Sequence, residues 1–396
     1  MWSTSTSAPL TPAFPREEYE QRTLRVRAEM AARGLDLHVC HNLANICYLT
    51  GFQTLGSYGY GHYAAIVPRE GSPVLFVSDF ESHNARLYAW IDRLATYPVA
   101  DTRERPLDTL AVCLQEMGIR SHRIGFEPGH YSLTVEEWRR MRELLPDIEF
   151  VDALDLVDQV KQIKSPAEVD ILRRAASLTT AGLRAAREVA REGCDDNALA
   201  AAMYQAVVSR GGEYFSLQPI VTAGARSGIP HSTFRRAALQ SGDPVFLELS
   251  ACVDRYSAPA MRTLCIGPPS DAVRNAADAC RVTIEALTSA IGPGRVARDV
   301  AQEASRVLRS TGVDLLWHGF YGYSVGLTFP PMCSDCVADV AIAESSSLIL
   351  EPGMVFHCSI SLRKVGEFGV ACGDTVLITN SGCEVLTQSP RELAVC

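Results

Sequence analysis

A strong helix-start signal near the middle of the chain divides the sequence into two regions with different patterns. Ser165 is a favoured N-cap residue, Pro166 suits the first helical position, and Glu168 completes a capping box. Before this signal, short apolar runs alternate with helical patterns. After it come long helical patterns and then strand patterns with glycine turns. We therefore predict an α/β domain over residues 1–160 and an α+β domain over residues 161–396.

The elements of the first region follow from periodicity and turn residues. Residues 1–15 are rich in Ser, Thr and Pro and lack a basic segment followed by an apolar core, so we expect a flexible arm and not a signal peptide. Gly34 is a typical residue after a helix end. The expected helices cover 16–33 and 107–117, and the expected strands cover 37–40, 64–68, 74–77 and 123–126.

The second region opens with two long helices and continues with two further helices between groups of strands. The helical patterns cover 167–192, 196–210, 271–291 and 296–310. The strand patterns cover 219–222, 244–250, 256–266, 354–358 and 375–378. Helices beside a sheet of sequential strands are typical of an α+β domain.

Charge and composition exclude several classes of partner. The net charge is -9 without a block of basic residues, so we expect no nucleic-acid partner. No apolar run reaches the roughly 18 residues of a membrane span. The 13 cysteines are scattered, which is typical of reduced thiols in a cytoplasmic protein. Cys333 and Cys336 have metal-site spacing, but no second such pair accompanies them.

Seven short motifs follow one another along the second region. They are IKSPAE at 163–168, Gly224 followed by Pro230-His231, GDPVFL at 242–247, Tyr256 to Arg262-Thr263, GYSVGL at 322–327, LEPGMVF at 350–356 and GDTVLIT at 373–379. In this order they resemble the motifs of the pita-bread enzymes, namely creatinases, prolidases and Xaa-Pro aminopeptidases. The resemblance implies a creatinase-type N-terminal domain, a pita-bread catalytic domain and a homodimer.

The peptidases of this family hold two divalent cations with two Asp, one His and two Glu side chains. Carried onto this sequence, the five positions are Glu248, Pro259, Tyr323, Ser359 and Gly373. A single carboxylate remains, and Pro and Gly offer no side-chain donor. We therefore expect no metal, no other cofactor and no metallopeptidase activity.

Further segments resemble the metal-free ectoine hydrolases. These segments are ELSAC at 248–252, RYSAPAMRT at 255–263, GYSVG at 322–326 with FPP at 329–331, and FH at 356–357. Two features depart from the pattern: SYGYGH at 57–62 replaces an expected segment with Trp and His, and Gly373 replaces a carboxylate that creatinase retains. The resemblance implies a metal-independent hydrolase of a non-peptide C–N bond in a small cyclic amidine, guanidine or amide.

Three residues are candidates for the chemistry. His231 is the expected proton shuttle, because an unperturbed His has a pKa of about 6.5. Glu248 is expected either to attack the amidine carbon or to pair with the amidinium. Tyr323 is expected to donate a hydrogen bond to developing charge. A cyclase or lyase on the same scaffold, or a catalytically inactive binding protein, remains as an alternative.

The expected substrate contacts come from both domains. Arg262 and Arg226 are candidates for a substrate carboxylate, because guanidinium binds carboxylate in a bidentate manner. His357 and Phe329 are expected beside the substrate. The family resemblance also implies that Tyr58, Tyr60 and His62 reach the pocket of the other subunit.

Overall fold

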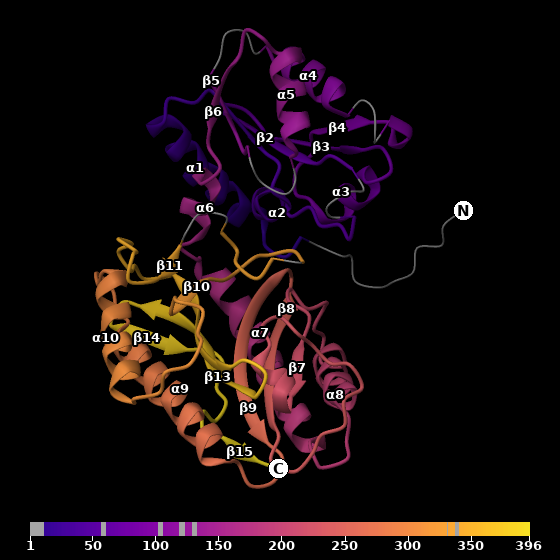
Figure 1. The fold of residues 1–396 in the computed structure, drawn as a ribbon. Coiled ribbons are helices and arrows are strands. Elements are labelled where there is room, and N and C mark those ends of the chain that lie inside the picture. Colours follow the sequence, from indigo (N-terminus) through magenta and orange to yellow (C-terminus); the bar gives the residue numbers. More distant parts are fainter. Residues whose placement is uncertain are drawn as a thin grey trace. The chain divides into compact units, whose positions relative to one another are not determined.

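The computed structural model describes residues 12–56, 61–101, 106–118, 123–128, 133–330, 332–336 and 340–396. The chain forms two compact units, Met1–Lys161 and Gln162–Cys396, which appear in Figure 1 in indigo to magenta and in magenta to yellow. The division falls one residue after the expected boundary. Each unit has its own sheet.

Unit 1 is a six-stranded mixed sheet with helices. The strand order is β4-β3-β2-β1-β5-β6. Antiparallel pairs join β1, β2 and β3, and the remaining pairs are parallel. The strands are β1 (Leu37–Cys40), β2 (Ala64–Pro68), β3 (Val74–Ser78), β4 (Leu94–Tyr97), β5 (Arg123–Phe126) and β6 (Glu149–Asp152). The predicted α/β class of this domain is confirmed.

The described part of unit 1 contains the two expected helices and four that the sequence analysis did not predict. They are α1 (Arg16–Ala32), α2 (Leu43–Thr50), α3 (Ser82–Tyr88), α4 (Pro106–Glu116), α5 (Val135–Leu144) and α6 (Leu156–Lys161), with a 3-10 turn at Val99–Asp101. Every residue of α2 is buried, so this helix has no polar stripe that would mark its period.

The expected N-terminal arm is partly wrong. Residues 1–11 lie outside the described part of the chain, but the ring of Phe14 is buried. It lies 5.9 Å from the ring of Tyr19 and 4.2 Å below the guanidinium of Arg22. An aromatic packed against α1 fixes the end of the segment before that helix.

Unit 2 contains a nine-stranded sheet with the main order β11-β10-β12-β13-β9-β8-β7. In addition, β14 pairs with β13, and β15 pairs with β9. The strands are β7 (Ile220–Ala223), β8 (Pro244–Val253), β9 (Tyr256–Cys265), β10 (Gly322–Ser324), β11 (Ala341–Ile342), β12 (Val355–Lys364), β13 (Phe368–Thr379), β14 (Gly382–Val385) and β15 (Ala394–Val395). The predicted α+β class is confirmed.

Four long helices accompany this sheet. They are α7 (Pro166–Val189), α8 (Asp196–Val208), α9 (Asp271–Ala290) and α10 (Ala297–Ser310), and a 3-10 turn, η2, covers Gly224–Gly228. The predicted capping box is present: Glu168 N–H donates to the Ser165 hydroxyl, and the Ser165 N–H donates to the Glu168 carboxylate. The helix-start signal therefore begins α7 as expected.

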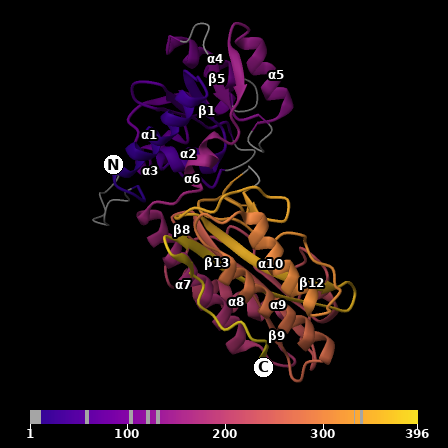
Figure 2. The same ribbon diagram turned by 90° about the vertical axis from the view of Figure 1, so that its left-hand side faces the viewer.

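The helices of unit 2 cover one face of its sheet. Alternate residues of β12 from Phe356 to Leu362 share a core with α9 and α10, and α9 lies along β12 and β13 (Figure 2). Leu249 of β8 packs against α7. Because side chains alternate between faces, Glu248 and Ser359 point to the other side. We call this side the second face.

Two further features concern all the described residues together. No helix among them is long and apolar enough to cross a membrane. All 13 cysteines fall within the described ranges, and none of them forms a disulfide bond.

Candidate active site on the second face of unit 2

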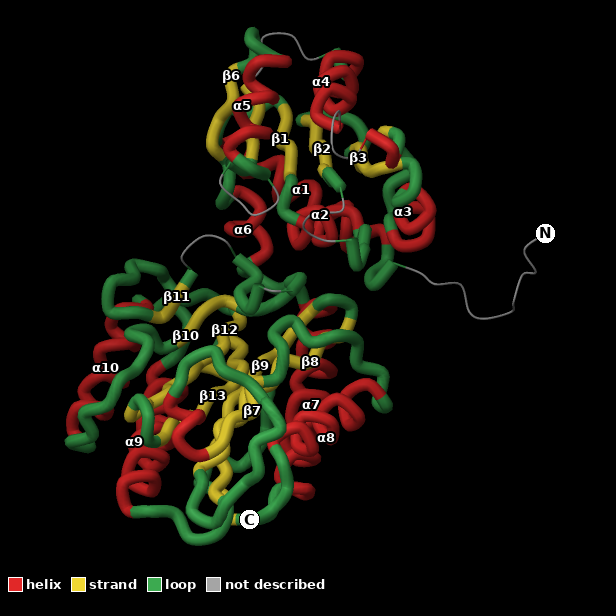
Figure 3. The backbone as a smooth tube through the Cα atoms, turned by 45° about the vertical axis from the view of Figure 1, so that its right-hand side comes forward, coloured by secondary structure: helices red, strands yellow, loops and turns green. Residues whose placement is uncertain are grey.

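Four residues face one another across four neighbouring strands of the second face. Ser359 of β12 lies opposite Gly373 of β13, Gly373 lies opposite Met261 of β9, and Met261 lies opposite Glu248 of β8. Figure 3 shows these strands side by side. Opposed residues of antiparallel strands point to the same face. The row therefore brings together three of the five positions that the resemblance assigns to metal ligands.

The other two positions lie beside this row. Pro259 is opposite Ser250, two residues along β8 from Glu248. Tyr323 of β10 is opposite His357 of β12. All five positions are thus on the second face, and Glu248 is the one among them that carries a carboxylate.

Glu248 is a buried carboxylate without a hydrogen bond. The residue is 5% exposed, and no described residue donates a hydrogen bond to it. Burial raises its pKa from 4.5 to about 7, although the positive charge of Arg363 acts in the opposite direction. A buried, unpaired acid is unfavourable for stability, and a carboxyl with a pKa near neutrality can give or take a proton at physiological pH.

Arg363 is a functional candidate that the sequence analysis missed. It lies on β12 on the same face as Ser359, four residues away. Its guanidinium lies 4.4 Å from the centre of the Phe246 ring, and Phe246 precedes Glu248 by two residues on β8. Burial lowers the pKa of Arg363, against the effect of Glu248. Counting alternate residues along β12 from Ser359 would have found it.

Tyr323 is close enough to Glu248 for their charges to interact. Burial raises the pKa of its hydroxyl well above 10, and the neighbouring Cys333 and Glu248 raise it further. The pKa of the Cys333 thiol is also raised, chiefly by burial. Glu248, Tyr323 and Cys333 are therefore close enough to influence one another, and Tyr323 is a neutral hydrogen-bond donor at neutral pH.

His357 occupies the space above Gly373. Its ring is fully buried, and neither ring nitrogen has a hydrogen-bond partner among the described residues. Burial lowers its pKa from 6.5 to about 4, and its ring centre lies 5.4 Å from that of Tyr323. A Cβ atom at Gly373 would lie 3.1 Å from Cε1 of His357. The ring has no exposed surface in this conformation, and the expected substrate contact of His357 stays a prediction.

His231 lies in the loop after η2. Its side chain is exposed, its backbone φ is 54°, and no described residue forms a hydrogen bond or ion pair with its ring. A non-glycine residue in this left-handed region is uncommon and often marks a functional loop. Ile229, two residues earlier, accepts a 3.5 Å hydrogen bond from Nη1 of Arg363. The structure thus connects the segment of His231 with Arg363, although it shows no direct contact between His231 and Glu248.

Arg226 already has an acidic partner in this structure, and its expected substrate contact stays a prediction. Its Nη1 donates a 2.8 Å hydrogen bond to the buried carboxylate of Asp196. Asp196 also accepts hydrogen bonds from the backbone N–H groups of Arg235 and Ala237. This arrangement holds the loop that follows His231, so Arg226 has a structural role here.

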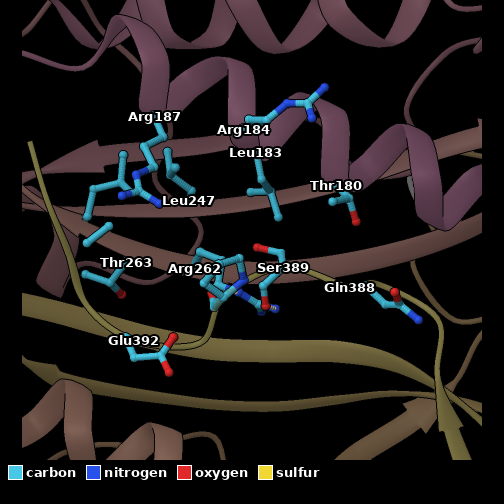
Figure 4. Close-up of a pocket in the computed structure, with 13 residues that line it drawn as sticks. Thr180, Leu183, Arg184, Arg187, Leu247, Arg262, Thr263, Gln388, Ser389 and Glu392 are labelled. Carbon is cyan, nitrogen blue, oxygen red and sulfur yellow. Dashed lines mark hydrogen bonds between the residues drawn. The ribbon is translucent and has the colours of Figure 1, made fainter.

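Arg262 is also a structural residue and not a substrate contact. It lies opposite Leu247 and therefore points away from Glu248. Its five N–H groups donate to the carboxylate of Asp374 and to the backbone carbonyls of Met261, Gly373, Ser389 and Pro390, at 2.7–2.8 Å. Figure 4 shows Arg262 beside Ser389, in a cavity of about 330 Å³ on the α7 side. No donor remains for a substrate.

Of the remaining expected contacts, Phe329 and His62 fall within the described residues. Phe329 is buried, and its ring centre lies 5.9 Å from the guanidinium of Arg255. Tyr58 and Tyr60 lie outside the described residues. His62 belongs to unit 1, where its Nε2 lies 2.8 Å from a carboxylate oxygen of Glu137.

One other cluster has the composition of a metal site. Within the described ranges, His38, Cys40 and Glu127 of unit 1 place ligand atoms within 4.8 Å of one another. Glu127 already accepts hydrogen bonds from the backbone N–H groups of His41 and Asn42 and from the side chain of Asn45. These hydrogen bonds satisfy the buried carboxylate of Glu127, so its burial does not require a bound cation.

Comparison with known proteins assigns both parts of the chain. The model of metallopeptidase family M24 matches residues 170–380, and that of the creatinase/prolidase N-terminal domain matches residues 22–163. Ectoine hydrolase from Halomonas elongata is 31% identical over 96% of this chain and 98% of its own. A Sinorhizobium fredii protein described as an uncharacterized hydrolase/peptidase is 29% identical over 96% of this chain and 98% of its own.

Solved structures show the same two-domain fold. Prolidase from Thermococcus sibiricus gives a TM-score of 0.84 at 20% identity, covering 96% of this chain and 99% of its own. Prolidase from Pyrococcus horikoshii gives 0.81 at 21% identity, covering 94% of this chain and 99% of its own. The predicted pita-bread architecture is confirmed. The chain therefore belongs to metallopeptidase family M24 and carries the family's creatinase/prolidase N-terminal domain.

Proposed function

We propose that this protein is a metal-independent hydrolase that cleaves a non-peptide C–N bond in a small cyclic amidine, guanidine or amide. The buried, unpaired Glu248 on the second face carries this proposal. The similarity to ectoine hydrolase over nearly the whole chain supports the same class of reaction.

The donor set of the second face does not fit the two cations of the peptidases in this family. Of the five positions, Pro259 and Gly373 offer no side-chain donor. The pKa of Tyr323 is raised well above 10, so its hydroxyl is neutral, and Ser359 is a neutral alcohol. Divalent cations prefer carboxylates and imidazole. The reaction proposed below therefore uses protein side chains and water alone.

The pKa of Glu248 gives it a defined role. With a pKa of about 7, both the protonated and the ionised form of Glu248 are accessible at neutral pH. A cationic amidinium beside it favours the ionised form, because an opposite charge lowers the pKa of a carboxyl. Glu248 then either attacks the amidine carbon or takes a proton from the water that attacks it.

The reaction consumes one water. A C–O bond forms at the amidine carbon, the C–N bond breaks, and the leaving nitrogen receives a proton. His231 supplies the second proton-transfer group, and the Tyr323 hydroxyl donates a hydrogen bond to the charge that develops in the transition state.

Mass spectrometry tests the reaction class. Ectoine, 5-hydroxyectoine and creatine are incubated with the protein and followed for the gain of one water. Glu248→Gln is expected to lower turnover by roughly 100- to 10,000-fold, whereas Glu188→Gln, which removes an exposed carboxylate of α7, retains activity. Turnover unchanged by Glu248→Gln would rule out the assigned role.

Single-turnover hydrolysis in H₂¹⁸O tests for covalent attack by Glu248. If Glu248 attacks the carbon and water resolves the covalent intermediate at the glutamate carbonyl, one ¹⁸O atom enters the carboxylate, and peptide mass spectrometry finds it there. Label in the product alone would exclude this covalent route, and it is the result expected if Glu248 acts as a base. Elemental analysis of active protein is expected to find no stoichiometric metal, and two ions per chain would refute metal independence.

The proposal includes a cytoplasmic homodimer. The lack of disulfide bonds among the 13 cysteines supports a reducing compartment. Light scattering in solution is expected to give twice the mass of the chain, and a monomeric mass would contradict the dimer.

A further inference from the structure

The hydrogen bonds of Arg363 leave most of its guanidinium without an acceptor. Nη1 donates to the backbone carbonyl of Ser227 at 2.6 Å and to that of Ile229 at 3.5 Å. No described residue accepts a hydrogen bond from Nε or Nη2 of Arg363. By contrast, all five N–H groups of Arg262 have acceptors. The free Nε and Nη2 form the edge of a guanidinium that binds carboxylates in a bidentate manner.

The surroundings make this free edge unusual. Arg363 is 9% exposed, so water does not fully solvate it. Its guanidinium rests on the ring of Phe246, which fixes the plane of the group. Among the described residues, no carboxylate forms an ion pair with Arg363. A buried cation that lacks a counter-charge is unfavourable unless a ligand supplies one.

Glu248 does not supply that counter-charge. It influences the pKa of Arg363 and is influenced by it, but its oxygens do not come within ion-pair distance of Arg363. The two opposite charges therefore lie near each other on the second face without touching. A ligand that meets both must carry an anionic group for Arg363 and a cationic group for Glu248.

We propose that Arg363 binds the carboxylate of the substrate through Nε and Nη2. The substrate is then a small zwitterion that places its amidine or guanidine carbon at Glu248. This inference rests on the proposed hydrolase function and assigns to Arg363 the role that the sequence analysis gave to Arg262 and Arg226.

The same side chain connects the substrate with the loop of His231. Nη1 donates hydrogen bonds to the backbone carbonyls of Ser227 in η2 and of Ile229. The turn η2 can approach β13 closely because Gly369 of β13 has no side chain. The Gly369 N–H donates a 2.7 Å hydrogen bond to the Ser227 hydroxyl. A substrate carboxylate on the other edge of Arg363 would therefore be positioned relative to this loop.

Steady-state kinetics with ectoine and its carboxamide test the inference. Arg363→Gln is expected to raise KM for ectoine by about 10- to 100-fold, because it removes a charge-assisted bidentate contact. It should change KM for the neutral carboxamide by less than about threefold, and Arg363→Lys should lie between. Arg184→Gln, which removes an exposed guanidinium of α7, is the matched control. Equal losses for both compounds would mean that Arg363 only holds the backbone of η2, and would overturn the proposal.

A binding measurement keeps the test valid if neither compound is turned over. Trifluoroacetate is titrated with the protein and followed by ¹⁹F line broadening, with trifluoroacetamide as the neutral probe. Broadening of trifluoroacetate is expected with the unmodified protein and Arg184→Gln, and should be lost with Arg363→Gln while thermal unfolding confirms the fold. Binding without turnover would count against the hydrolase proposal alone. Equal broadening with Arg363→Gln would refute the carboxylate site.

Discussion

Replacing Glu248 by Gln is expected to remove a pH-dependent destabilisation of unit 2. The pKa of this carboxyl is 4.5 in its ordinary state and about 7 in the folded chain, because the group is buried. Below pH 4.5 both states are protonated, and the group makes no difference to stability. Between pH 4.5 and 7 the unfolded chain ionises first, so the free energy of unfolding falls as the pH rises. Above pH 7 the full destabilisation is present.

The magnitude follows from the two pKa values. Since one pKa unit corresponds to about 1.36 kcal/mol, the unmodified protein loses roughly 3 kcal/mol between pH 4.5 and pH 8.5 through this group. The Glu248→Gln variant has no titrating group at this position. Its free energy of unfolding, relative to that of the unmodified protein, should therefore rise by the same amount between pH 4.5 and pH 8.5. A buried Gln amide has a desolvation cost of its own, but that cost does not change with pH. The change with pH is therefore the diagnostic quantity.

Thermal unfolding of both proteins at pH 4.5 and pH 8.5 measures this change. For a unit of this size, 1 kcal/mol shifts Tm by about 2–4 °C, so the difference in Tm between the two proteins should change by about 6–12 °C. Glu188→Gln controls for the loss of one exposed carboxylate. An equal difference at both pH values would refute the reasoning. A reversed sign would indicate a carboxylate stabilised by a cation.

Three further substitutions test the assignments on the two faces of the sheet. Arg262→Ala is expected to destabilise unit 2 by about 3 kcal/mol in thermal unfolding, because it deprives the buried Asp374 of a guanidinium partner. A stable variant with a raised KM would instead indicate a substrate contact. Tyr323→Phe is expected to lower kcat by about 10- to 100-fold with an unchanged Tm, since it removes one hydrogen-bond donor; unaltered kcat would exclude that role. Gly373→Ala is expected to destabilise by about 1–3 kcal/mol through contacts with Ser359, the Cys358 carbonyl and His357. His357→Ala should relieve the part of this effect that comes from the imidazole in a double-mutant cycle, and additive losses would show that the two positions do not interact.

The sequence predicts the elements whose signals are local. Ser165, Pro166 and Glu168 are enough to place the start of α7, because capping involves neighbouring residues alone. Glu248 stands out because a carboxylate within an apolar strand requires an explanation. By contrast, α2 is buried on all sides and so lacks the polar stripe that marks a surface helix.

The side-chain assignments fail where they depend on strand register. Arg262 directly follows Met261, and this shift of one residue places it on the opposite face from Glu248. Its partner Asp374 is 112 residues away in the chain, so no local pattern reveals the pair. Arg363 is missed for the related reason that its position relative to Glu248 depends on the order of β12, β13, β9 and β8.

The contact between His357 and Gly373 also makes these two positions interdependent. A side chain at residue 373 would extend toward the imidazole ring, so the effect of changing one residue depends on the identity of the other. A carboxylate placed at residue 373 by a single mutation would meet the side chains of Ser359 and His357. The outcome of any change at residue 373 therefore depends on its sequence background.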